Sequence, residues 1–154
     1  MRTDSRLSRM LHVLLHMARH ASPMTSEQIA AMLRTNAVVV RRTMAGLRDA
    51  GYVSATRGHG GGWEIACDLD QVSLLDVHRA VGGNRLFALG HEHDNPDCGV
   101  ERVVNAAIDD ALQQAEALLL ARLGEVSLAD LAADFDALCE SGGWKRRTAR
   151  AHLP

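Results

Sequence analysis

The chain of 154 residues has few aromatic residues, few cysteines and no long apolar run, and each shortage excludes a class of protein. Phe, Trp and Tyr make up 3% of it, so any core must be mainly aliphatic. Its three cysteines are too few and too far apart for a disulfide scaffold, which favours a reducing compartment. No apolar run approaches the roughly 20 residues of a membrane helix, and the polar first eight residues do not resemble a signal peptide. We therefore expect a cytoplasmic protein without a membrane partner.

The composition is that of an ordinary folded protein, but the charges are distributed unevenly along the chain. Hydrophobic residues make up 47% and charged residues 23%, and the length fits one domain with a helical appendage. Residues 1–63 carry nine Arg against three acidic side chains, whereas residues 64–140 carry four Arg against sixteen. A basic front half is typical of a surface that meets phosphates, although random surface charge would also produce it.

The first half of the chain predicts a winged helix-turn-helix. Apolar residues spaced by three and four predict helices over residues 4–20, 25–33 and 36–50, the last two separated by a tight turn. Alternation then predicts strands over residues 52–57 and 63–67, joined by a Gly-rich tip. Helix, helix, turn, helix and hairpin is the order of a winged helix-turn-helix, so the fold class is mainly α with a small β-hairpin.

The second half predicts a long helix for dimerisation. Ser73 with Asp76 forms a capping box for a short helix, and Ser127 with Asp130 forms one for the last helix. Between them, apolar spacing from Val100 continues for about 24 residues, which gives a helix roughly 36 Å long. Because one small winged-helix body cannot cover that length, we expect a partner helix from a second copy.

These elements divide the chain into four predicted parts. Residues 1–83 form a DNA-binding domain, and residues 84–98 form a connecting or sensing loop. Residues 99–140 form the dimerisation helices, and residues 141–154 form a flexible tail that contains four cations.

Double-stranded DNA is the predicted partner, contacted at two places. The N-terminal end of the third helix should reach base edges, with Arg41 and Arg42 binding guanine or phosphate. Val38 is open to two interpretations, a thymine-methyl contact or one edge of a buried Val38–Val40 run. The hairpin tip should approach phosphates or a narrow minor groove, the alternative being a merely exposed turn. The predicted contact residues are Thr35, Asn36, Ala37, Val38, Arg41 and Arg42 on the helix, and Arg57, Gly58, His59 and Gly60 at the tip.

Short motifs along residues 24–81 carry a family resemblance. They are Ile29-Ala30, Leu47, Ala50-Gly51-Tyr52-Val53, Arg57-Gly58, Gly61-Gly62-Trp63 and Leu74-Leu75-Asp76-Val77. With these motifs the chain resembles the Rrf2 family of bacterial transcription regulators, which includes IscR-, NsrR- and CymR-type proteins. The order of the later helices extends the resemblance to about residues 1–139. It implies a homodimer that binds a pseudo-palindromic operator at the nucleoid, with repression favoured over activation.

Many members of that family hold an iron–sulfur cluster on three cysteines in the loop before the long helix. Here that loop contains only Cys98, so no cluster or other cofactor is predicted. His91, His93 and Cys98 match no strong metal template, and no metal site is predicted. The dipole of the long helix would favour a thiolate at Cys98, whereas three nearby carboxylates oppose it. Redox sensing and a half-buried apolar role for Cys98 both stay open, and the sequence indicates no effector.

No enzyme motif is complete. His59-Gly60-Gly61-Gly62 copies an oxyanion-hole sequence of some lipases, but the chain has no G-x-S-x-G nucleophile elbow. It also has no Walker loop, H-E-x-x-H or C-x-x-C. We therefore predict no catalytic site, and a protein-interaction or assembly module is the alternative to DNA binding.

Overall fold

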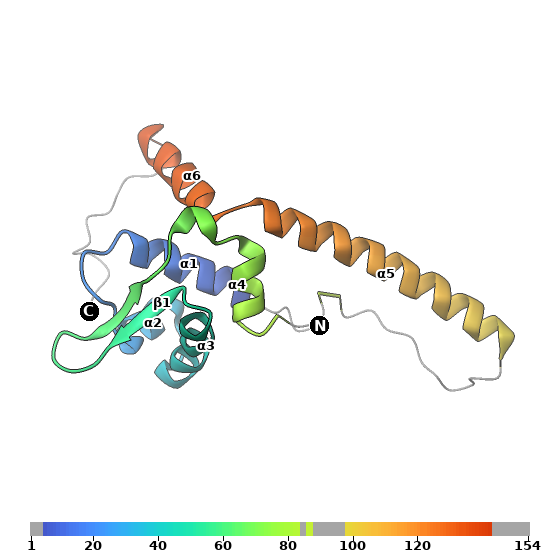
Figure 1. Cartoon of the computed structure of the whole chain (residues 1–154), viewed down its shortest axis with the longest axis horizontal. Coiled ribbons are helices and arrows are strands. Elements are labelled where there is room, and N and C mark those ends of the chain that lie inside the picture. Colours follow the sequence, from blue (N-terminus) through green and yellow to red (C-terminus); the bar gives the residue numbers. More distant parts are fainter. Residues whose placement is uncertain (1–4, 84–85, 88–97, 143–154) are drawn as a thin grey trace.

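The computed structural model describes residues 5–83, 86–87 and 98–142, and its elements follow the predicted order (Figure 1). They are α1 (Arg6–Ala18), α2 (Ser26–Leu33), α3 (Ala37–Asp49), β1 (Val53–Thr56), β2 (Gly62–Ile65), a 3-10 turn (Leu69–Gln71), α4 (Leu74–Ala80), α5 (Gly99–Glu125) and α6 (Leu128–Glu140). The mainly α fold class with a small antiparallel hairpin is confirmed.

Three helices begin at reciprocal capping boxes, and the two boxes predicted at Ser73 and Ser127 are confirmed. At the start of α2, the Gln28 backbone N–H donates to Thr25 Oγ1 at 3.1 Å, and the Thr25 N–H donates to Gln28 Oε1 at 2.8 Å. The same reciprocal pattern starts α4 and α6, with the pairs Ser73 and Asp76, and Ser127 and Asp130. Each box supplies acceptors for two backbone N–H groups, one at the N-cap residue and one in the first helical turn, so these helix starts are fixed locally.

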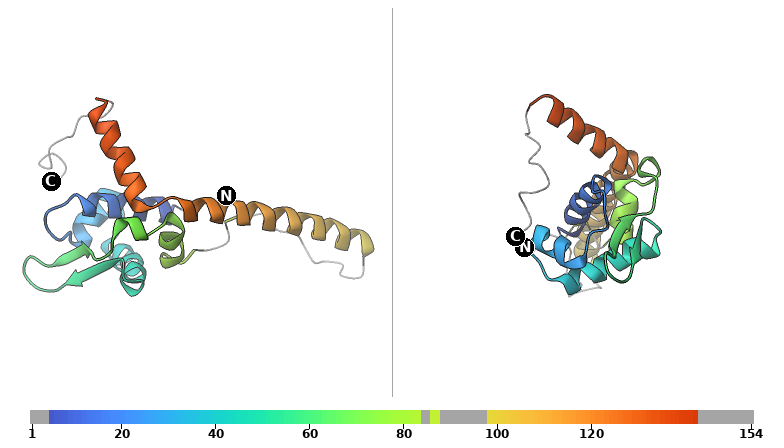
Figure 2. Two further views of the ribbon diagram at one scale, coloured as in Figure 1. Left: turned by 45° about the horizontal axis from the view of Figure 1, so that its top comes forward. Right: turned by 90° about the vertical axis from the view of Figure 1, so that its left-hand side faces the viewer.

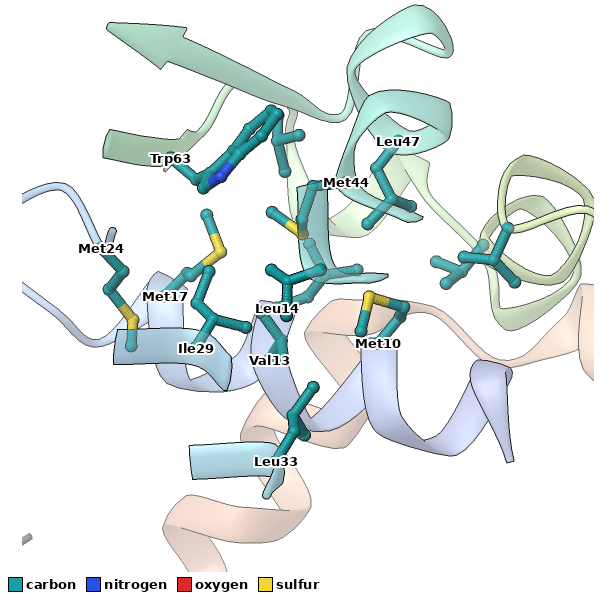
Figure 3. Packing of buried hydrophobic residues seen from close by; sticks show 14 of the residues in the cluster. Met10, Val13, Leu14, Met17, Met24, Ile29, Leu33, Met44, Leu47 and Trp63 are labelled. Carbon is teal, nitrogen blue, oxygen red and sulfur yellow. The ribbon is translucent and has the colours of Figure 1, made fainter. Parts of the chain in front are cut away.

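The head of the molecule, residues 5–83, is built around α1. Val13 and Leu14 of this helix are completely buried, and side chains from α2, α3 and β2 surround them (Figure 3). Leu128, the first residue of α6, is also completely buried in the same cluster. The start of α6 is therefore part of the core of the head.

The hairpin is tied to the helices at its base. Strands β1 and β2 pair antiparallel with Val53 opposite Ile65, and they are shorter than the predicted strands. Trp63 pairs through its backbone with Met24, and its buried indole Nε1–H donates to Ser26 Oγ at 3.0 Å. A buried indole N–H needs such a partner. These bonds fix the position of the hairpin relative to α2.

Helix α5 extends out of the head as a rod (Figures 1 and 2). It has 27 residues, slightly more than predicted, which gives a length of about 40 Å. Its C-terminal end is anchored because the Leu74 N–H donates to the Val126 carbonyl and the Leu128 N–H donates to the Val72 carbonyl, both at 2.9 Å. Along the rest of the rod no residue is buried. In the described part of the chain, no helix combines the length and apolarity that crossing a bilayer requires.

Helix α6 lies on the side of α1 opposite α2 and α3 (Figure 2). Arg19, just after α1, holds it there: its Nη2 donates to the Ala132 carbonyl at 2.7 Å and to Asp136 Oδ1 at 2.9 Å. The guanidinium also lies 4.8 Å from the centroid of the Phe135 ring. Within this helix Leu128 is buried, whereas Leu138 is exposed.

Candidate nucleic-acid interface

The turn between α2 and α3 places the start of α3 on the surface. Arg34 adopts the left-handed conformation with φ 51°, and the Thr35 N–H donates to the Ala30 carbonyl at 2.9 Å. Asn36 Oδ1 then accepts from the Val38 N–H at 2.7 Å and caps α3. Thr35 is half-buried, and Asn36 is exposed.

One face of α3 is buried and the other is open to solvent. Val40, Met44 and Leu47 are buried against the core, as their spacing predicts. On the opposite side Arg41 and Arg42 are exposed.

The valine run at the start of α3 is mostly exposed. Val38 is 62% exposed and Val39 is 52% exposed, so only Val40 fits the interpretation of a buried run. Ala37 and Ala45 are half-buried. Val39 is not among the predicted contacts. Consecutive residues of a helix lie about 100° apart around its axis, so the place of Val39 beside the buried Val40 could have indicated that Val39 is exposed.

The two arginines of the exposed face have different surroundings. Arg41 Nη1 lies 3.1 Å from Glu27 Oε1 on α2, in an ion pair between the two helices. Within the described residues, Arg42 makes no ion pair or side-chain hydrogen bond. Sequence reasoning missed Glu27, although it is the one acidic residue between positions 5 and 48.

The hairpin tip is exposed and its conformation requires glycine. Gly58 and Gly60 have φ of 95° and 78°, and a Cβ at either position would point into open space. At Gly61 a Cβ would lie 2.4 Å from the Thr56 carbonyl oxygen, so only glycine fits. The predicted tip residues, all exposed, are Arg57, Gly58, His59 and Gly60.

Charge is divided between the head and the rod. Described residues 5–63 contain eight Arg and two acidic side chains, whereas residues 98–142 contain two Arg and nine acidic side chains. Because α3 packs on β1, the exposed arginines of α3 and the hairpin belong to one basic part of the molecule. Phosphates are attracted to this part and repelled by the acidic rod and α6.

The three cysteines lie on separate elements. Cys98 is the N-cap residue of α5, is half-buried and makes no capping hydrogen bond through its side chain. Cys67 follows β2, where burial and, less strongly, Asp68 raise the pKa of its thiol. Cys139 lies near the end of α6. The structure therefore does not bring the three thiols together.

These elements define the chain as a winged helix-turn-helix protein with a long additional helix. Residues 3–134 match the model of the Rrf2 family, described as iron-dependent transcriptional regulators, and the chain belongs to this family.

Relatives with assigned functions or solved structures are similar to most of this chain. A Bacillus subtilis (strain 168) protein assigned as the HTH-type transcriptional regulator YwnA is 33% identical over 129 residues, covering 83% of this chain and 95% of the relative. A crystal structure assigned as a DNA-binding protein is 30% identical with a TM-score of 0.63, covering 82% of this chain and 98% of the other. A Lactobacillus plantarum protein assigned as a transcriptional regulator has the same fold, with a TM-score of 0.73 at 20% identity over 90% of this chain and 95% of its own.

The donor groups that the structure describes do not fit the iron dependence of the family's description. Among those residues no group of three His, Cys, Asp or Glu side chains is placed to hold a metal ion. An iron–sulfur cluster needs several thiolates converging on one point, and the described thiols are on separate elements. His91 and His93, weighed as ligands with Cys98, lie outside the described residues.

Proposed function

We propose that this regulator is a homodimer that binds a pseudo-palindromic operator in double-stranded DNA. The observation that carries the proposal is the exposed N-terminal half of α3, where Val38, Arg41 and Arg42 face solvent opposite a buried face. The packing of the head does not require an apolar side chain or two adjacent cations at these surface positions.

In the proposed complex α3 enters the major groove, because a helix about 10–12 Å wide fits a groove about 12 Å wide. Arg41 and Arg42 can donate to guanine or to phosphate, and Val38 can contact a thymine methyl group. The tip of the hairpin reaches the neighbouring backbone or minor groove, where Arg57 or His59 meets the negative potential.

The second copy in this proposal covers the apolar stripe of α5, which we define as Val100, Val103, Val104, Leu118 and Leu119. Val100 and Leu118 are each 74% exposed, and an apolar stripe of this length is typical of an interface. A two-fold dimer presents two α3 helices and therefore binds two related half-sites.

The predicted division of the chain is kept in this proposal, although the first residue of α6, Leu128, packs in the core of the head. Residues 1–83 would bind DNA, residues 84–98 would connect and sense, residues 99–140 would hold the dimer together, and residues 141–154 would add a basic tail.

Repression is the proposed effect on transcription, through occupation of the promoter by the bound dimer. A reporter behind a selected operator should be less active when the wild-type protein is present, and an increase would contradict repression.

We further propose Cys98 as the thiol through which an oxidant would act on DNA binding. Its place at the start of α5 joins the connecting loop to the dimer helix. Mild oxidation should change operator affinity for the wild-type protein and for a Cys139→Ser control, and should leave Cys98→Ser unaffected. A Cys98→Ser protein that responds normally would end this role.

Selection of bound duplexes from a random pool tests the DNA-binding proposal. The selected site should be a pseudo-palindrome, and its affinity should fall steeply with salt because phosphate contacts release counterions. Arg41→Ala should lower the discrimination between selected and random duplexes, whereas loss of a purely phosphate-binding Arg should weaken both similarly.

Equally negligible affinity for selected and random duplexes at low salt would contradict DNA binding. The basic head would then belong to a protein-interaction module.

A further inference from the structure

The described residues 5–63 contain two acidic side chains, and each forms an ion pair with an arginine of α3. Asp49 is the neighbour of its partner Arg48 in the sequence, at the C-terminal end of the helix. Glu27 lies in the first turn of α2, fourteen residues from its partner Arg41. The second pair therefore exists only because of the way α2 packs on α3.

This ion pair makes Arg41 unlike the adjacent Arg42. The charge-assisted hydrogen bond of 3.1 Å restrains the guanidinium of Arg41 beside the N-terminal end of α2. Within the described chain the guanidinium of Arg42 has no such restraint. A long flexible cation can follow any nearby phosphate, and such contacts carry no sequence information.

We propose that Glu27 is a positioning residue that determines specificity. Its carboxylate holds the guanidinium of Arg41 where it can reach a base edge, and away from the phosphates. This inference rests on the proposed DNA-binding function. The carboxylate itself repels phosphate. An arginine has five N–H donors, and the contact with Glu27 uses one nitrogen, Nη1. Donors remain for the O6 and N7 acceptors of a guanine, so Arg41 can bind the carboxylate and the base together.

The ion pair adds little to the stability of the head. Its side chains are 53% exposed for Arg41 and 69% exposed for Glu27, and exposed pairs of this kind contribute little. Glu27→Gln should therefore leave the head folded, which permits a binding experiment on the full chain.

The test measures the affinities of wild type and four variants for a selected and a random duplex over a range of salt concentrations. The variants are Glu27→Gln, Arg41→Ala, the double variant and Asp49→Asn. In Glu27→Gln the freed Arg41 should bind phosphate, so discrimination should fall about fivefold to tenfold. The salt slope for the random duplex should steepen by about 0.9, the value for one additional phosphate contact.

Two comparisons separate positioning from a general effect of charge. Asp49→Asn removes the same charge from the other ion pair of α3 and should leave discrimination unchanged. In the Arg41→Ala background, Glu27→Gln should also have no effect on discrimination.

The inference is overturned if Glu27→Gln keeps wild-type discrimination. It is also overturned if Asp49→Asn lowers discrimination as much as Glu27→Gln does, or if Glu27→Gln lowers it equally in the Arg41→Ala background. A wild-type protein without any preference among duplexes would overturn the proposed function along with it. A wild-type preference that Glu27→Gln leaves intact would overturn only the role of Glu27.

Discussion

Helices α1 and α5 both repeat apolar residues at intervals of three and four, but they differ in what covers these residues. In α1 the side chains of Val13 and Leu14 are completely buried by the rest of the head. In α5 Val103 is 71% exposed, and the helix has no buried residue. The head obtains its core from its own residues, whereas the described part of the chain leaves the apolar side chains of α5 open to solvent.

The largest expected effect is a loss of stability from a change confined to the head. Leu14→Ala should remove about 2–5 kcal/mol from the free energy of unfolding, because it leaves a cavity in the most buried part of the core. Chemical denaturation followed by circular dichroism measures this change. Val39→Ala, at an exposed position of α3, is the control and should stay within about 0.5 kcal/mol of wild type. Equal stabilities for the two variants would contradict the assignment of the core.

The second effect is a loss of dimer affinity from a change confined to the rod, α5. Leu118→Asp should weaken the dimer about 100-fold or more, because burial of a Leu contributes about 1.5–3 kcal/mol and each dimer contains the change twice. Sedimentation equilibrium measures the dimer constant, and circular dichroism should show a folded head. Gln113→Asp places the same charge at an exposed polar position of α5 as a control. If both variants dimerise like wild type, the stripe is not the interface.

A smaller effect concerns the exposed valine of α3. If Val38 contacts a thymine methyl group, replacing that thymine by uracil should weaken binding about fourfold, the value of one buried methyl group. The same replacement should have no effect on Val38→Ala. Affinities measured across a selected site with single uracil replacements test this. A series in which no replacement distinguishes the two proteins would remove Val38 from the contacts.

The smallest effect is a pH dependence at the start of α4. Hydrogen bonds from the hydroxyl and backbone N–H of Ser73 lower the pKa of Asp76 from its ordinary 3.8. The stabilisation is therefore complete above that unfolded value and is lost as the pH falls through the lower folded value. Unfolding between pH 5 and 2 should show a smaller loss for Asp76→Asn than for wild type. Parallel curves would contradict the role of this carboxylate.

Features determined by neighbouring residues could be predicted from the sequence. The capping box of Thr25 with Gln28, the N-cap at Asn36 and the buried face of Val40 depend on spacings of a few residues. Local hydrogen bonds and helical periodicity determine these features, whatever the rest of the fold. The fold class followed from their order along the chain.

Features that depend on packing between distant elements could not be predicted. The contact of Glu27 with Arg41 requires the angle between α2 and α3, and the contact of Arg19 with Asp136 joins residues 117 positions apart. Periodicity predicted an apolar face on α5 and on α6 alike, but it could not tell that Leu128 would enter the core of the head.

The solution mass of the wild-type protein at micromolar concentration tests the role of α5 most directly. The chain has a mass of 16.7 kDa, and burial of the apolar stripe in a second copy predicts twice that value by sedimentation equilibrium. A mass of 16.7 kDa that persists on concentration would contradict the dimer, and with it the pairing of two α3 helices on one operator.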